Sequence, residues 1–170
     1  QQVRGEPVMV ELIRDFDLKD RVPDLLEFLR KNPGDEAATE AVRYVAKVDG
    51  RRIDPLLRDP QATPDLIAAV GRSGLGEWSD RLAGIVVSGE HRAVQREAAI
   101  QALLVTEAGS KALVNALQGK GIPEPLRETA IEGLLTVRWA SVREEAAKLA
   151  PVRQAKAFGL PPKDGMLKMP

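Results

Sequence analysis

The single histidine is the residue in this sequence that most directly suggests chemistry. His91 follows Gly89 and Glu90, and an imidazole can ligate a metal or transfer a proton near neutral pH. A metal site needs further ligands at suitable spacing, but the sequence contains no second histidine and no cysteine. We therefore interpret His91 as a surface or helix-capping side chain, and we expect no metal site, no disulfide and no thiol nucleophile.

Glycine motifs and neighbouring carboxylates give no stronger indication of catalysis. Gly74 and Gly76, and likewise Gly119 and Gly121, flank a single residue, but neither pair completes a phosphate-binding or dinucleotide-binding motif. We interpret both as turns between helices. No Gly-x-Ser-x-Gly sequence is present for a hydrolase nucleophile. The sequence therefore predicts no cofactor and no nucleophilic serine.

Acidic residues occur close together at three places: Asp15 and Asp17, Asp35 and Glu36, and Glu144 and Glu145. Adjacent residues of a helix point about 100° apart, so such neighbours do not share a proton between their carboxylates. We expect Glu36 and Glu144 to lie in first turns of helices, where negative charge complements the helix dipole. The sequence thus predicts no catalytic residue.

Basic residues are densest around Arg51, Arg52 and Arg58, where a phosphate or an acidic partner could bind. Asp54 and Asp59 lie among them and cancel much of their field. The whole chain has 25 basic and 25 acidic residues and a net charge of zero, which disfavours a nucleic-acid partner.

The spacing of apolar residues predicts helices throughout. Apolar residues recur at three- and four-residue steps, and the alternation typical of strands is nearly absent. Thr63 before Pro64 is typical of a helix N-cap, and Ser141 with Glu144 fits a capping box. Six glycines at short intervals suit helix C-caps: Gly34, Gly50, Gly74, Gly89, Gly119 and Gly121. No apolar run approaches the roughly 20 residues that a membrane-spanning helix needs.

The sequence also repeats itself. The segment 96–104 aligns with 127–135, with Arg-Glu first and small and aliphatic residues in matching places. The same register fits less closely elsewhere, so the equivalent positions are 8, 41, 66, 99 and 130. A second amphipathic segment follows each of them, at about 20–31, 52–59, 78–88, 109–118 and 141–150. Pro55 and Pro60 shorten the second of these segments.

A pair of helices in about thirty residues cannot bury its apolar face alone, whereas stacked pairs can. We therefore predict an all-α fold, an α-solenoid of about five antiparallel helix pairs. A compact up-and-down bundle is the alternative, but it does not require a repeated sequence. Ala99, Ala102, Ala130 and Gly133 would let neighbouring helices approach closely, which also accounts for an aromatic content of only 4%.

The pattern Arg-Glu-x-Ala-Ile-x-x-Leu-Leu, followed by a second helix, resembles HEAT repeats, especially the short HEAT-like repeats of bacterial proteins. The resemblance spans residues 6–150, and the short step from 41 to 66 departs from it. We expect a HEAT-like domain over residues 1–150 and a linker or C-terminal tail rich in proline and glycine over 151–170. Such a block is similar to the HEAT-like region of large bacterial dehydrogenases linked to c-type cytochromes. That resemblance implies a propeller before the block, a cytochrome domain after it, and an extracytoplasmic location.

We expect the chain to act as a non-catalytic scaffold that contacts a protein partner or neighbouring domains of its own chain. The second helices would line the concave side, with polar candidates at Arg81, Lys111, Asn115, Arg143 and Glu144. Trp78 and Trp139 are either exposed anchors for a partner or rings folded over a loop. The alternative is a HEAT-like enzyme or nucleic-acid-binding module, similar to proteins of DNA-base excision or to chromophore lyases. It requires a cleft with a buried carboxylate and stacked aromatic residues.

Overall fold

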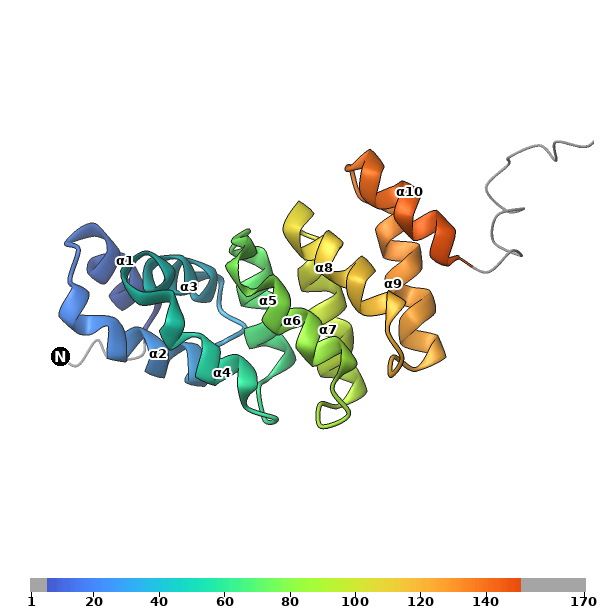
Figure 1. Ribbon diagram of the computed structural model, residues 1–170. Coiled ribbons are helices and arrows are strands. Elements are labelled where there is room, and N and C mark those ends of the chain that lie inside the picture. The colour runs from blue at the N-terminus through green and yellow to red at the C-terminus, as the bar shows by residue number, and fades with distance from the viewer. Residues whose placement is uncertain (1–5, 151–170) are drawn as a thin grey trace, which may run out of the picture.

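The computed structural model describes residues 6–150, which form ten α-helices and three short 3-10 helices, with no strand in this range (Figure 1). The first helices of the predicted pairs are α1 (Pro7–Asp15), α3 (Glu36–Asp49), α5 (Pro64–Arg72), α7 (Ala93–Leu103) and α9 (Glu124–Thr136). The second helices are α2 (Val22–Lys31), α4 (Asp54–Arg58), α6 (Ser79–Val87), α8 (Glu107–Gln118) and α10 (Ala140–Leu149). The 3-10 helices are η1 (Lys19–Arg21), η2 (Gly50–Arg52) and η3 (Gly76–Trp78). The prediction of an all-α fold is confirmed, and the predicted linker over 151–170 lies outside the described residues.

The helices follow one another along an elongated array, with α1 near one end and α10 at the other (Figure 1). Each odd-numbered helix contacts the next odd-numbered helix, from α1 to α9. From α4 to α10, each even-numbered helix likewise contacts the next even-numbered one. Buried hydrophobic residues extend from Met9 to Ala146, so the core runs along the array rather than around one centre.

Side chains cap several helix N-termini. Thr63 Oγ1 accepts a hydrogen bond of 3.2 Å from the Leu66 N–H, which confirms the predicted cap of α5. Asp35 caps α3, where Glu36 lies in the first turn as expected. The capping box predicted at Ser141 is wrong, because α10 already begins at Ala140 and its N-cap residue is Trp139. Glu144 consequently lies beyond the first turn of α10.

Only two of the glycines proposed as C-caps have the positive φ that favours glycine. Gly74 follows the last turn of α5 with φ 72°, and Gly121 has φ 120° in the turn before α9. The other four glycines in that set have negative φ, so the left-handed C-cap prediction is wrong for Gly34, Gly50, Gly89 and Gly119.

An aspartate takes the left-handed position after α1. Asp17 has φ 49°, and the N–H of Leu18 donates to the Ile13 carbonyl at 3.0 Å, as in a Schellman motif. The Tyr44 hydroxyl donates to Asp17 Oδ1 at 3.0 Å. This hydrogen bond, helped by Lys19 and Lys47, holds the pKa of Asp17 below its usual 3.8, and burial raises the pKa of Tyr44. The turn therefore ties α1 to α3.

Close helix contacts occur where the sequence has small residues. A Cβ atom added to Gly71 of α5 would lie 2.5 Å from the Cβ atom of Ala102 on α7. A Cβ atom added to Gly133 of α9 would lie 2.4 Å from Leu104 Cδ1. Ordinary carbon contacts are about 3.5–4.0 Å. Gly71 is therefore needed for the observed approach, because it also faces the Ala102 backbone, whereas Gly133 faces only the end of the Leu104 side chain. The predicted packing role of Ala102 and Gly133 is confirmed.

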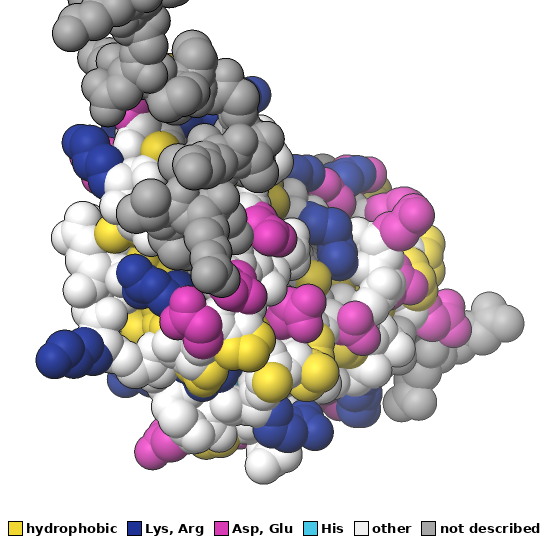
Figure 2. Space-filling model, turned by 90° about the vertical axis from the view of Figure 1, so that its right-hand side faces the viewer, with side chains coloured by type: hydrophobic (Ala, Val, Ile, Leu, Met, Phe, Trp, Pro, Cys, Tyr) yellow, Lys and Arg dark blue, Asp and Glu magenta, His cyan; other side chains and the backbone are white. Residues whose placement is uncertain are grey.

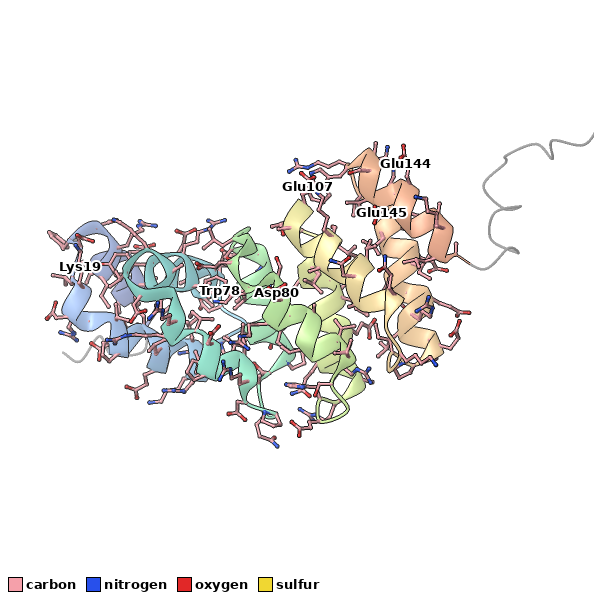
Figure 3. All side chains as sticks on the ribbon, viewed as in Figure 1. Lys19, Trp78, Asp80, Glu107, Glu144 and Glu145 are labelled. Atoms are coloured by element: carbon pink, nitrogen blue, oxygen red, sulfur yellow. The ribbon has the colours of Figure 1, made fainter. Side chains whose placement is uncertain are left out.

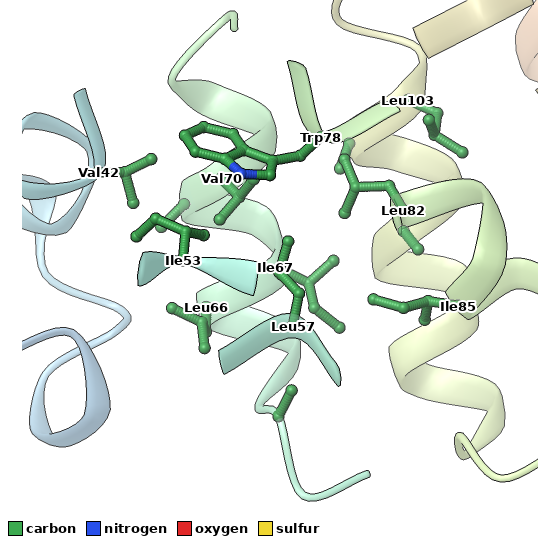
Figure 4. Close-up of a cluster of buried hydrophobic side chains, with 14 of the residues drawn as sticks. Val42, Ile53, Leu57, Leu66, Ile67, Val70, Trp78, Leu82, Ile85 and Leu103 are labelled. Carbon is green, nitrogen blue, oxygen red and sulfur yellow. The ribbon is translucent and has the colours of Figure 1, made fainter. Parts of the chain in front are cut away.

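Trp78 belongs to the hydrophobic core. Trp78 is the last residue of η3 and is only 3% exposed. Figure 4 shows the indole beside Val70 of α5, with Val42 of α3 and Ile53 close by. The short helix α4, shortened as Pro55 and Pro60 predicted, adds the buried Leu57 to the same cluster. The interpretation of Trp78 as an exposed anchor is therefore wrong, because a partner could not reach the ring.

The repeated Arg-Glu sequence has a structural explanation in its arginines. Arg96 Nε donates to the Val86 carbonyl at 2.7 Å, at the end of α6. At the equivalent position, Arg127 Nη1 donates to the Leu117 carbonyl at 2.5 Å, at the end of α8. Each guanidinium thus binds a carbonyl that the preceding helix leaves without an intrahelical partner, where the helix dipole favours positive charge.

Candidate functional site

A groove between α8 and α10 brings together two residues that the sequence proposed for partner binding. Lys111 and Asn115 line it from α8, and Ser141 and Glu145 line it from α10. In both helices the two polar residues are four positions apart and so share one face. The floor is formed by Val114 and Val142, each 2% exposed, and the groove has a volume of about 220 Å³.

The two charged residues that line this groove differ in whether an ion pair balances their charge. Lys111 Nζ lies 2.7 Å from Glu107 Oε1, one turn earlier on α8, so its charge is balanced within its own helix. Glu145 is exposed and forms no ion pair within residues 6–150. Figure 3 shows Glu107 at the start of α8 and Glu144 and Glu145 along α10. The groove therefore has an apolar floor and an unbalanced carboxylate on its α10 side.

Two predicted residues on α10 do not line the groove. Arg143 is half-buried, and its Nη1 donates to the Val137 carbonyl at 2.7 Å, so this side chain fastens the turn before α10. Glu144 is exposed but does not line the groove. Trp139 is half-buried at the start of α10, and the Arg138 guanidinium lies 4.9 Å from the centre of its ring.

A second groove, of about 200 Å³, lies between α4 and α6 and extends to the loop before α7. Arg58 lines it from α4, Asp80 and Arg81 from α6, and His91 from the loop. Arg81 Nη2 lies 3.5 Å from Asp54 Oδ2, so part of its charge is balanced. Arg81 therefore lines the same groove as Arg58, which belongs to the basic group that the sequence indicated.

His91 is half-buried, and both of its ring nitrogens are enclosed with no hydrogen-bond partner among residues 6–150. A capping role is therefore wrong for this side chain, because it accepts and donates no hydrogen bond to the backbone. Within the described residues, no group of three His, Asp or Glu side chains is arranged to hold a metal ion.

A third and more open groove, of about 310 Å³, lies between α3 and η3, lined in part by Arg43, Lys47 and Glu77. Arg43 is already engaged, since its Nε donates to the Ser73 carbonyl at 3.1 Å. Neither tryptophan lines any of these three grooves.

The buried polar side chains of residues 6–150 are Ser73, Ser79, Gln95, Arg96 and Ser110, and no Asp or Glu in this range is buried. Figure 2 shows acidic and basic side chains interspersed with hydrophobic ones over the C-terminal end of the array. No helix among the described residues has the length and apolar character to span a membrane.

No family model, no curated protein and no solved structure matches this chain. The HEAT identity and the dehydrogenase parent therefore stay predictions from the sequence.

Sequence reasoning missed Ser141 and Glu145 as groove residues, because the first was interpreted as a cap and the second as one of two adjacent carboxylates. Their four-residue spacing, matched by Lys111 and Asn115, was a signal that could have found them. Which two faces meet depends on the contact between α8 and α10, which the spacing alone does not reveal.

Proposed function

We propose that this chain is a HEAT-like α-solenoid that serves as a non-catalytic scaffold and binds a protein partner, or a neighbouring domain of its own chain, through its second helices. The contacts support the solenoid. Odd-numbered helices contact in succession, and so do the even-numbered helices from α4 onward, as stacked pairs require.

The observation that carries the choice of surface is the position of the grooves. Two of the three grooves, α4–α6 and α8–α10, each lie between consecutive even-numbered helices, and the third lies between α3 and η3. In a stacked array, such grooves between second helices recur along one side and offer a partner several separate contacts. Mixed surface charge and a net charge of zero favour a protein partner over nucleic acid.

The buried polar groups support a structural role for the interior. Gln95 is fully buried, and its Nε2 donates to the carbonyls of Pro60 at 2.9 Å and Ala62 at 2.6 Å. Arg96, described above, is likewise bonded to backbone carbonyls. These side chains stabilise loops and helix ends, and neither of them lines a groove.

Site-specific photo-crosslinking in cells tests this proposal. A benzophenone amino acid would replace Arg81 on α6 or Asn115 on α8, and in matched controls Glu97 on α7 or Glu132 on α9; all four residues are exposed. We expect the α6 and α8 positions to crosslink to the same partner or domain, identified by mass spectrometry, and the α7 and α9 positions not to. Equal crosslinking from the controls, or none from α6 and α8, would overturn the proposal.

A further inference from the structure

We propose that the α8–α10 groove binds a basic side chain, arginine or lysine, of a peptide segment in the partner protein. This inference rests on the proposed function, because it names the chemistry that one part of the second-helix surface recognises. It is argued from the size, floor and charge of the groove.

The size of the groove suits one long side chain. Its volume of about 220 Å³ is below the roughly 300–1,000 Å³ of pockets that hold drug-sized molecules. Its floor consists of Val114 and Val142, which contact the core and present only their outer atoms. An aliphatic stem of three or four methylene groups can lie on such a floor, as arginine and lysine stems do on apolar surfaces.

The charge of the groove selects a cation at the end of that stem. Glu145 supplies a carboxylate that forms no ion pair within residues 6–150. Lys111, which also lines the groove, is paired with Glu107 at 2.7 Å. Lys148, one turn after Glu145, does not line the groove and forms no ion pair with it. Arg143 is directed to the Val137 carbonyl.

Neutral acceptors complete the site. The Asn115 side-chain carbonyl and the Ser141 hydroxyl form no hydrogen bond within the described residues, and both line the groove opposite or beside Glu145. A guanidinium has five N–H donors, and an ammonium has three. One carboxylate and two neutral acceptors therefore match the donors of a basic side chain. An acidic guest would meet Glu145 with like charge, and the charge of Lys111 is already balanced by Glu107.

The test is an NMR titration of the full 170-residue chain, labelled with 15N, with three capped tripeptides. Acetyl-Gly-Arg-Gly-amide carries the proposed side chain, the norleucine analogue carries an uncharged stem, and the glutamate analogue carries the opposite charge. We expect the arginine peptide to shift the amide signals of Asn115, Val142 and Glu145 with a dissociation constant in the millimolar range. We expect the norleucine peptide to bind several-fold more weakly and the glutamate peptide not to shift these signals.

Variants separate the groove from general electrostatic attraction. Glu145→Gln should weaken the arginine peptide about threefold to fivefold, as expected for an exposed ion pair. Glu97→Gln removes an exposed carboxylate from α7, outside the groove, and should leave binding unchanged. An equal loss in both variants would overturn the inference.

Equal binding of the norleucine and arginine peptides would also overturn it, since the occupant would then be apolar. So would the absence of shifts around Val114 and Val142 with the arginine peptide. Neither result would contradict the proposed function, which fails instead if the crosslinking positions on α6 and α8 contact nothing. The two proposals can therefore fail separately.

Discussion

Replacing Gly71 with alanine tests the closest helix contact in the array. The new methyl carbon would lie 2.5 Å from the Cβ atom of Ala102 and 2.6 Å from its Cα atom. Ordinary carbon contacts need at least about 3.5 Å, so α5 and α7 would have to separate locally by about 1 Å. Because one of the two contacts is with backbone, rotation of a side chain cannot relieve it.

The expected effect follows from two opposing contributions. Overpacking a core contact costs about 1–3 kcal/mol, whereas alanine is favoured over glycine in a helix by about 0.8–1.0 kcal/mol. The overpacking cost exceeds the propensity gain, so we expect Gly71→Ala to lower the free energy of unfolding by up to about 2 kcal/mol. Gly84 in α6 is the matched control, because a Cβ atom there would have no neighbour within 4 Å, and Gly84→Ala should raise stability by about 0.8 kcal/mol.

The assay is thermal and urea unfolding followed by circular dichroism at 222 nm. In a chain of this size, each 1 kcal/mol shifts the midpoint temperature by about 2–4 °C, so the two variants should move in opposite directions. Ala102→Gly should cost less in the Gly71→Ala variant than in the wild type, since one of the two clashes disappears. If Gly71→Ala were as stable as Gly84→Ala, α5 and α7 would not approach as described.

Three further changes give distinct results. Gln95→Ala should lower the free energy of unfolding in urea by about 3 kcal/mol, because buried backbone groups lose their hydrogen-bond partners. Gln101 is exposed on the same helix, so Gln101→Ala should change this free energy little, and equal effects would contradict the buried hydrogen bonds of Gln95. His91→Leu should raise the free energy of unfolding by about 1 kcal/mol, and with it the midpoint temperature, because it removes two enclosed nitrogens that have no hydrogen-bond partner. A lower midpoint would show that these nitrogens do have partners. The lowered pKa of Asp17 means that its stabilising contribution is complete above about pH 5 and is lost as the pH falls through its folded-state pKa, below 3.8. The difference in unfolding free energy between wild type and Tyr44→Phe should therefore shrink from about pH 7 to about pH 3, and a constant difference would argue against the hydrogen bond.

Local sequence signals predicted the helices well, whereas the burial and contacts of particular side chains depend on tertiary packing. Pro55 shortened α4 as expected because proline acts on its own helix. The burial of Trp78 could not be predicted from local signals, since it depends on how α3 and α5 pack around the ring, and Val42 of α3 lies 36 residues earlier in the chain. Asp17 took a position that glycine usually occupies, and only Tyr44, 27 residues later, shows why an aspartate suits it. The groove containing Glu145 depended in the same way on which helices meet.

Arg96 has a consequence for how the array unfolds. Its side chain lies on α7 and donates both to the carbonyl at the end of α6 and, at 3.0 Å, to the Gly121 carbonyl in the turn before α9. An array whose units touch only their neighbours can open one unit at a time from either end. The Arg96 guanidinium links α6, α7 and the turn before α9, which belong to three consecutive helix pairs. It opposes such stepwise opening, because separating any of these pairs leaves its buried hydrogen-bonding groups without partners. We therefore expect the amides of α6, α7 and α9 to exchange with solvent as a single cooperative unit rather than one helix pair at a time.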